Sequence, residues 1–210
     1  MCQVKQDTAD TARLLKQAQR GDRSAFEQLF QRYRPDLCRM VELRLDKKLR
    51  SRMDPSDVVQ EAQLEAFRRL ADFLNRQPMP FWLWLRKTAY ERLLNLRRDH
   101  LRAKRREVGR EVPLPERSSL LLAQKLLAGG STPSQRLAQR EYEQRVRQAV
   151  AGLPEADREI LLMRNVEGLT HQEVGCLLEI SDAAARKRYG RALLRLRNLL
   201  GANGLTESQL

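Results

Sequence analysis

Cationic side chains gather near the C-terminal end of the chain, in the segment that follows Ser181. Between Ser181 and Leu200 the only acidic residue is Asp182, and the small residues Ala183 and Ala184 stand at the front. The cations of this segment are Arg186, Lys187, Arg188, Arg191, Arg195 and Arg197. Small residues admit base edges, and flanking cations bind phosphate. The predicted chemistry is therefore noncovalent recognition of DNA. A solvated helix face is the alternative, but such a face normally pairs charges of opposite sign.

The residues before this segment predict the helices that position it. Thr170 and Glu173 form a capping box, which starts a short helix that we expect to end near Leu178. Ser181 can cap a second helix after a tight turn. Gly175 lacks a side chain and would let the two helices approach closely. Two short helices joined in this way form a helix-turn-helix.

A second basic block runs from Phe81 to Arg110 and contains few acids. Aromatic residues lie at its start, and cations combined with aromatics suit single-stranded or distorted nucleic acid. Trp82 falls on the apolar stripe of the expected helix, so we predict that it belongs to the core. Trp84 is a candidate for packing or for base stacking, with packing favoured.

Composition limits the class of the protein. The chain has 210 residues with a formal net charge of +13, which favours polyanionic partners. Its three scattered cysteines fit a reduced compartment and show no metal-ligand spacing. We find no apolar run long enough to cross a membrane and no signal peptide, so we expect a cytoplasmic protein without metal or cofactor. His100 and His171 lack partners for catalysis, which argues against an enzyme.

Helical periodicity without strand patterns predicts an all-α protein of two small helical domains joined by a flexible linker, the C-terminal one containing the helix-turn-helix. We place the first domain at residues 8–106, the linker at 107–131 and the second domain at 132–203. Thr132 and Gln135 suggest a capping box at the start of the second domain. The linker contains "LLLAQKLLA", which can form a short apolar helix.

An acidic face begins at Asp54, which we expect to cap a helix that has Pro55 at its first position. Asp57, Glu61 and Glu65 follow at helical spacing. Such a face repels DNA and suits a basic or polar protein partner, although an ordinary solvated surface explains it equally well.

Three stretches in this order resemble the extracytoplasmic-function (ECF) group of bacterial RNA polymerase sigma factors, of the sigma-70 family. They are "DPSDVVQEAQLEAF", then "FWLWLRKTAYERLLNLRRDHLRAKRR", and after a linker "LPEADREILLMRNVEGLTHQEVGCLLEISDAAARKRYGRALLRL". The resemblance implies an initiation factor that binds the clamp helices and flap of core polymerase and promoter DNA. It also allows an anti-sigma factor as partner.

The resemblance assigns roles to individual residues. It implies polymerase binding by Asp57, Val58, Val59, Gln60 and Glu61. It implies contacts with the minus-10 element by the loop that starts at Asn75 and by the following helix, through Asn75, Arg76, Trp84, Lys87, Asn95, Arg97 and Arg98. It implies contacts with the minus-35 element by Thr170, Ser181, Ala183, Ala184, Arg186, Lys187, Arg188 and Arg191. The family often reads S-x-G-T-V-K-S-R where this chain has "SDAAARKR", so the family's base preference does not carry over.

Two other functions remain as alternatives. A stand-alone helix-turn-helix regulator would bind an operator as a dimer without polymerase. A basic RNA-binding or ribosome-associated protein would explain the charge but not the capped helix pair.

Overall fold

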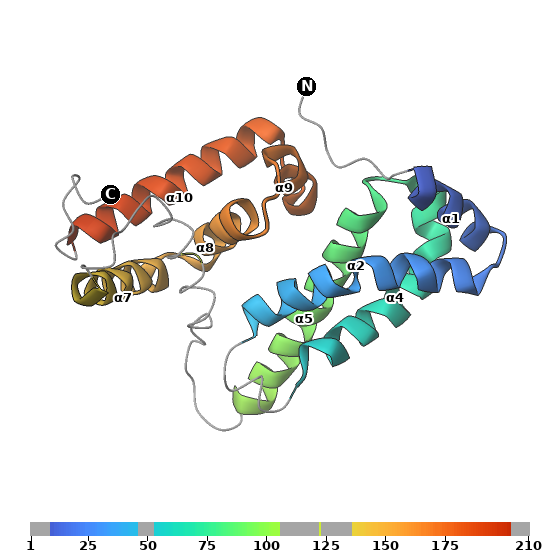
Figure 1. Cartoon of the computed structure of the whole chain (residues 1–210), viewed down its shortest axis with the longest axis horizontal. Coiled ribbons are helices and arrows are strands. Elements are labelled where there is room, and N and C mark those ends of the chain that lie inside the picture. The colour runs from blue at the N-terminus through green and yellow to red at the C-terminus, as the bar shows by residue number, and fades with distance from the viewer. Residues whose placement is uncertain (1–8, 46–52, 106–121, 123–135, 203–210) are drawn as a thin grey trace. The chain divides into compact units, whose positions relative to one another are not determined.

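The computed structural model describes residues 9–45, 53–105, 122 and 136–202 (Figure 1). Every regular element in these ranges is a helix, which confirms the predicted all-α fold. The chain divides into two compact units, Met1–Val112 and Pro113–Leu210. We describe each unit by itself.

Unit 1 is a bundle in which α2, α4 and α5 pack on one another and α1 packs on α2 and α4. Each helix turns one apolar stripe inward, as its sequence periodicity requires. Phe30, Val41, Val59 and Leu93 are fully buried in this core. The helices are α1 (Ala9–Gln19), α2 (Arg23–Arg44), α4 (Pro55–Arg76) and α5 (Phe81–Arg105).

Helix α2 continues through Pro35, although proline disfavours a helix interior. A proline inside a helix leaves the carbonyl four residues earlier without its partner. Pro35 and Gln31, which carries that carbonyl, both lie on the exposed face of α2. Water can therefore satisfy the Gln31 carbonyl, so the lost hydrogen bond does not interrupt α2.

The start of α4 agrees with its sequence signals. The Asp54 carboxylate accepts a hydrogen bond from the Ser56 backbone N–H at 2.7 Å, and Pro55 is the first helical residue. This backbone hydrogen bond holds the pKa of Asp54 below its ordinary value. The predicted loop is shorter than expected, because Asn75 and Arg76 still belong to the last turn of α4.

Gln77 ends α4 in the left-handed conformation, with φ of 38°. Side chains with a Cβ are strained there, whereas glycine is not. We expect Gln77→Gly to raise the free energy of unfolding of unit 1 by about 0.5–1 kcal/mol. Denaturant unfolding followed by tryptophan fluorescence measures this, since both tryptophans of the chain lie in unit 1. Gln31→Gly, in an exposed position inside α2, is the matched control and should destabilise by a similar amount.

Unit 2 is built around α10, which packs on α7, α8 and α9. Its core includes Val150, Ile160, Leu161, Val174 and Leu196. The helices are α7 (Arg136–Gly152), α8 (Glu155–Leu161), the π-helical turn η2 (Leu162–Val166), α9 (His171–Leu178) and α10 (Asp182–Ala202).

The predicted helix-turn-helix is formed by α9 and α10. The Thr170 hydroxyl accepts from the Glu173 backbone N–H at 3.2 Å, and the Glu173 carboxylate accepts from the Thr170 N–H at 2.7 Å. Glu179 then turns the chain with φ of 57°. The Ser181 hydroxyl accepts from the Ala184 N–H at 3.1 Å at the start of α10. Both predicted caps are confirmed.

Two predictions fall wholly or mostly outside the described residues. The capping box of Thr132 and Gln135 lies before the described part of α7. Of the segment "LLLAQKLLA" only Leu122 is described, as a helical and fully buried residue.

Candidate nucleic-acid interface

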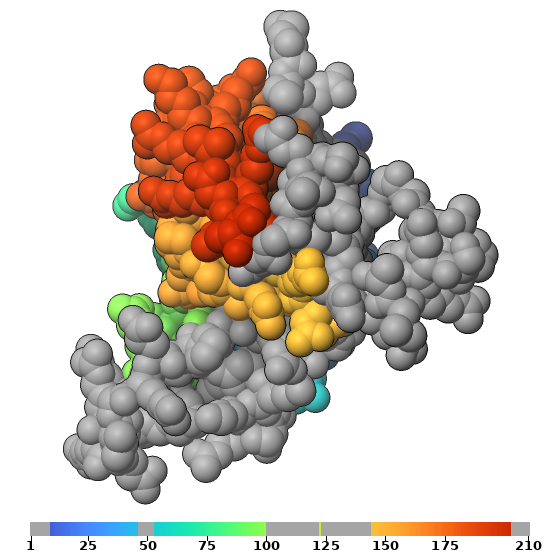
Figure 2. All heavy atoms as spheres, turned by 90° about the vertical axis from the view of Figure 1, so that its left-hand side faces the viewer, coloured from blue at the N-terminus to red at the C-terminus, as the bar shows by residue number. Residues whose placement is uncertain are grey.

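Helix α10 turns a cationic face to solvent. Its inward face carries Ala185, Ala192 and Leu196, which are buried, while Ala183 and Lys187 lie on the opposite, exposed face. This separation follows from the 3.6-residue period, which places positions 183, 187, 190, 191 and 194 together. Figure 2 shows α10, coloured orange to red, as an open part of the surface of unit 2.

The cations of α10 do not all have the same surroundings. Arg186 pairs with Asp182 one turn earlier at 2.5 Å. Arg195 pairs at 2.5 Å with Asp157 of α8, whose side chain is only 6% exposed. Arg195 therefore helps to fix α10 on α8, a role that the charge pattern did not reveal. Within the described part of the chain, no ion pair is formed by Lys187, Arg188 or Arg191.

The hydroxyls predicted to contact DNA also have structural roles. Thr170 and Ser181 accept backbone hydrogen bonds as helix caps. Each hydroxyl still has a hydrogen to donate, since accepting uses only a lone pair. Ser181 and Ala183 are exposed, whereas Thr170 and Ala184 are half-buried. The structure thus places Thr170 at the start of α9 and the other three residues at the start of α10.

A polar cluster behind the helix-turn-helix was not found by sequence reasoning. The Tyr189 hydroxyl donates to the Asn165 side chain at 3.1 Å, and its ring meets the His171 ring edge-on with 5.3 Å between centroids. The Arg164 guanidinium lies over the same tyrosine ring and donates to the Leu169 carbonyl. Burial, followed by Arg164 and Arg186, lowers the pKa of His171. This shift favours the neutral imidazole, and the cluster positions α10 against η2 and α9.

The minus-10 candidates in unit 1 separate into two groups. Arg76, Trp84 and Lys87 line one cavity of about 220 Å³ between the end of α4 and the start of α5. Asn95, Arg97 and Arg98 lie further along α5, outside this cavity; Asn95 there accepts a hydrogen bond from Arg98. Asn75 borders a different cavity. The cavity between α4 and α5 also includes residues that the sequence reasoning missed: Arg69, Asp72, Phe73, Pro78, Met79, Thr88 and Glu91.

Charged groups at this cavity form a network. Glu91 binds Arg69 at 3.3 Å and lies 4.0 Å from Lys87, and Arg76 binds Asp72 at 2.9 Å. These side chains are mostly exposed, so the pairs contribute little to stability. They do place donors and acceptors at the mouth of a cavity with an aromatic wall.

The two tryptophans have different surroundings, and only Trp82 departs from its predicted position. Trp84 is 6% exposed and stacks on Phe73, with 4.5 Å between ring centroids. Its rings therefore belong mainly to the core, as the residue pattern favoured, and as a DNA contact Trp84 can offer only the part that lines the cavity between α4 and α5. Trp82, predicted as core, is partly exposed. The reason is the phase of α5, in which Phe81, Leu85 and Trp84 face inward.

The five residues of the "DVVQE" segment do not share one surface. Val58 and Val59 are fully buried, so their assignment as polymerase contacts is corrected to core packing. Asp57 and Gln60 are exposed, and Glu61 is partly exposed and paired with Arg92 of α5. Two apolar side chains that sequence reasoning missed, Leu64 at 55% and Phe67 at 42%, are exposed on the same helix. The helical period of α4 places both residues away from its buried apolar stripe, and this spacing could have indicated their exposure.

Other types of site were also considered for the described residues. Among them no group of histidine, cysteine and carboxylate side chains is arranged to hold a metal ion. No described helix is both long and apolar enough to span a bilayer.

Comparison with known proteins gives consistent results. The family described as Sigma-70, region 4 matches residues 143–196. The chain is 38% identical over 144 residues to a "Probable RNA polymerase sigma factor RfaY" of Xanthomonas campestris pv. campestris, which covers 69% of this chain and about a third (33%) of that relative. It is 27% identical over 179 residues to the "RNA polymerase sigma-H factor" of Pseudomonas aeruginosa, covering 85% of this chain and 88% of the relative.

Two further similarities cover most of the chain. The "ECF RNA polymerase sigma-E factor" of Escherichia coli is 29% identical over 188 residues, which is 85% of this chain and 88% of the relative. Among solved structures, that of CnrH in complex with the cytosolic domain of CnrY matches with a TM-score of 0.53 at 24% identity. This match covers 90% of this chain and 96% of the other, and it shows a common fold.

Proposed function

We propose that this chain, which belongs to the extracytoplasmic-function group of the sigma-70 family, is an initiation factor that directs core RNA polymerase to specific promoters. In this proposal residues 132–203 contact the minus-35 element, residues 8–106 contact polymerase and the minus-10 element, and residues 107–131 connect them. The observation that carries it is the cationic face of α10, presented by a capped helix-turn-helix.

Contact with the minus-35 element is proposed for the exposed face of α10. Lys187, Arg188 and Arg191 are not occupied by ion pairs within the described residues, so they are available for phosphate or base edges. Ala183 leaves room for the helix to enter a major groove. Arg186 pairs with Asp182 one turn earlier, and because both side chains are largely exposed, exchange of this carboxylate for phosphate costs little.

Contact with the minus-10 element is proposed for the cavity between α4 and α5. Lys87 and Arg76 supply cations, Glu91 supplies an acceptor, and Trp84 with Phe73 supplies an apolar wall. An unpaired base that enters such a cavity gains hydrogen bonds and apolar contact, which favours an open strand. Asn95, Arg97 and Arg98 are proposed to follow the backbone along α5.

Polymerase binding is proposed for the exposed side of α4. Asp57 and Gln60 begin a polar surface that Leu64 and Phe67 continue with apolar groups. An exposed apolar side chain beside polar ones is typical of a protein interface. The partners proposed on this basis are the clamp helices and flap of core polymerase. CnrH, which shares the fold, is solved with the cytosolic domain of CnrY, and we extend the proposal to an inhibitory protein partner.

The proposed mechanism requires both units to bind the same core polymerase. Cations alone give weak and salt-sensitive DNA binding. Two weak contacts held at a fixed separation on polymerase act together through effective concentration. No covalent step is assigned to this chain, so we propose that it is not an enzyme and that it acts in the cytoplasm, where polymerase transcribes.

Replacement of Lys187 by alanine tests the minus-35 contact. We expect weaker promoter binding by the holoenzyme and a slope of log affinity against log salt that is smaller by about 1, because one phosphate contact is lost. Arg188→Ala should act in the same direction. Arg145→Ala, which removes an exposed cation of α7, is the matched control and should leave the slope unchanged. If Lys187→Ala and the parent chain gave equal slopes, the assignment of α10 as the DNA-contacting helix would be wrong.

Run-off transcription with purified core polymerase on genomic fragments tests the function as a whole. We expect discrete transcripts that require this chain. Tight binding to a defined operator by the purified chain alone, without transcripts, would instead support a stand-alone regulator.

A further inference from the structure

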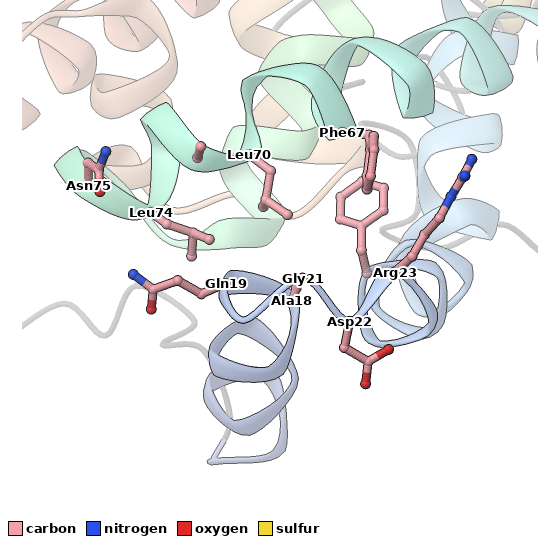
Figure 3. Close-up of a pocket in the computed structure, with 11 residues that line it drawn as sticks. Ala18, Gln19, Gly21, Asp22, Arg23, Phe67, Leu70, Leu74 and Asn75 are labelled. Atoms are coloured by element: carbon pink, nitrogen blue, oxygen red, sulfur yellow. The ribbon is translucent and has the colours of Figure 1, made fainter.

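A cavity of unit 1 adjoins a surface that already has a proposed role. It has a volume of about 370 Å³ and lies where the turn between α1 and α2 meets α4 (Figure 3). Phe67, which borders this cavity, is part of the exposed side of α4 that we propose for polymerase. The start of α10 in unit 2, by contrast, carries an exposed group whose chemistry the proposed function does not use.

This exposed group is the side chain of Ala183, in the first turn of α10. The next residue, Ala184, is half-buried, and Ala185 is buried in the core of unit 2. The Asp182 carboxylate is turned along the helix, where one oxygen binds Arg186 at 2.5 Å and the other oxygen is buried. The centre of this turn therefore presents a methyl group to solvent, with no donor or acceptor of its own.

Cations lie beside the Ala183 methyl on the same side of α10. Arg186 and Lys187 follow Ala183 by three and four residues, so the helical period places them one on each side of it, about one turn further along. All three residues are exposed. Both cations are proposed to bind phosphate. Phosphate contacts on either side of Ala183 would hold the start of α10 in the major groove, with the methyl group directed at the base edges.

A methyl group can distinguish bases in one way. It forms no hydrogen bond, so a base donor or acceptor pressed against it would lose water and gain no partner. In the major groove thymine is the base with an apolar group, its C5 methyl, and alanine is one of the side chains that contact this methyl. At the base that it faces, Ala183 therefore favours thymine.

We infer that Ala183 determines specificity within the minus-35 element by packing its methyl group against the C5 methyl of one thymine. The inference rests on the proposed function, and it gives Ala183 a role beyond leaving room for the helix. Sigma factors that this chain resembles often have glycine at the corresponding position of S-x-G-T-V-K-S-R, where this chain has "SDAAARKR". Glycine has no methyl group, so this contact is a property of the chain's own sequence.

The test removes the two methyl groups separately. Each thymine in the minus-35 element of a promoter identified by run-off transcription, on both strands, is replaced by uracil, which lacks only the C5 methyl. The affinity of the holoenzyme is then measured for each fragment. With the parent chain we expect one position at which uracil weakens binding about fourfold, as the exposure of one methyl group to water should give.

Ala183→Gly removes the other methyl group of the same contact. This variant should bind thymine and uracil equally at the sensitive position, because the two methyl groups act only through each other. Ala156→Gly is the matched control, since Ala156 is exposed and is the second residue of α8, as Ala183 is of α10. It should keep the fourfold difference. Each chain is compared with itself on two fragments, so a general loss of helix stability cancels.

Cytosine provides a second measurement at the sensitive position. Cytosine lacks the methyl group of thymine and also differs from it in hydrogen bonding, whereas 5-methylcytosine differs from cytosine by the methyl group alone. With the parent chain we expect 5-methylcytosine to bind about fourfold better than cytosine. With Ala183→Gly the two should bind equally. This comparison of two fragments with the parent chain also serves if Ala183→Gly fails to fold.

The outcomes separate this inference from the proposed function. If uracil changes the affinity at no position of the minus-35 element, Ala183 only leaves room for the helix and the inference is wrong, although a smaller salt slope for Lys187→Ala would still support minus-35 binding. A uracil effect that is the same in the parent and in Ala183→Gly assigns the contact to another side chain and also overturns the inference. Absence of run-off transcripts would overturn the proposed function, and the inference with it.

Discussion

Replacement of Trp84 by alanine is expected to lower the free energy of unfolding of unit 1 by about 3–5 kcal/mol, the usual cost of deleting a buried aromatic side chain. Trp84 is 6% exposed and packs on both Phe73 and Phe81. Alanine would leave a cavity where α4 and α5 meet, and the helices can collapse into it only partly. Denaturant unfolding followed by the remaining fluorescence of Trp82 measures the loss.

The neighbouring tryptophan provides the control. Trp82→Ala should cost less, because Trp82 is partly exposed and its buried indole N–H has no hydrogen-bond partner to lose among the described residues. Trp84→Phe should recover most of the stability, since it keeps an aromatic ring against Phe73. If Trp84→Ala instead left the unfolding curve unchanged and reduced only promoter opening, Trp84 would be a DNA contact after all.

The tryptophans show why helix phase limits prediction from sequence. The sequence predicted a helix over this region, and the structure has it as α5. A helix that is mostly buried at its start has apolar residues on nearly every side, as at Phe81, Leu83 and Leu85. The stripe is then ambiguous by one position, and Trp82, which was predicted to belong to the core, is the indole that stays partly exposed. Only the packing of α2 and α4 decides which indole is buried.

The "DVVQE" segment shows a different limit. A short motif on a helix covers both of its faces, since successive residues are about 100° apart. Family resemblance assigns the whole segment to one partner, but Val58 and Val59 are buried while Asp57 and Gln60 are exposed. The structure is needed to divide the motif into residues that maintain the fold and residues that a partner can reach.

Capped turns were predicted with the greatest success, because their physics is local. Side-chain hydrogen bonds to backbone groups within three residues determine them, and the distances at Asp54, Thr170 and Ser181 agree with the sequence. Contacts between distant residues were not predicted. The pair of Arg195 and Asp157 spans 38 positions, and no local pattern indicates it.

Gly175 gives the second large expected effect. A methyl group at this position of α9 would lie 2.8 Å from the backbone oxygen of Ile180 and 3.5 Å from the backbone nitrogen of Asp182. The Gly175 carbonyl also accepts hydrogen bonds from the backbone N–H groups of Glu179 and Ile180, and these two bonds close the turn. We expect Gly175→Ala to destabilise unit 2 by about 1–3 kcal/mol, because the methyl group meets backbone and the turn must open.

Gly175→Ala should also weaken DNA binding, because it changes the orientation of α10. Opening the turn rotates α10 away from α9, while Lys187 and Arg191 keep their exposure and charge. Hydrogen exchange measured on peptides of α9 and α10 should rise, and promoter binding should fall by more than with Lys187→Ala. Gly190→Ala is the matched control for stability. Apart from its chain neighbours and the backbone of α10, no described atom lies within 4 Å of a methyl group added at that position. Helix α10 should therefore gain about 0.5–1 kcal/mol of stability, and hydrogen exchange of its amides should slow. Unchanged exchange in Gly175→Ala would mean that the close approach of α9 to the turn is not what fixes α10, and the orientation would then have to come from the Tyr189 cluster.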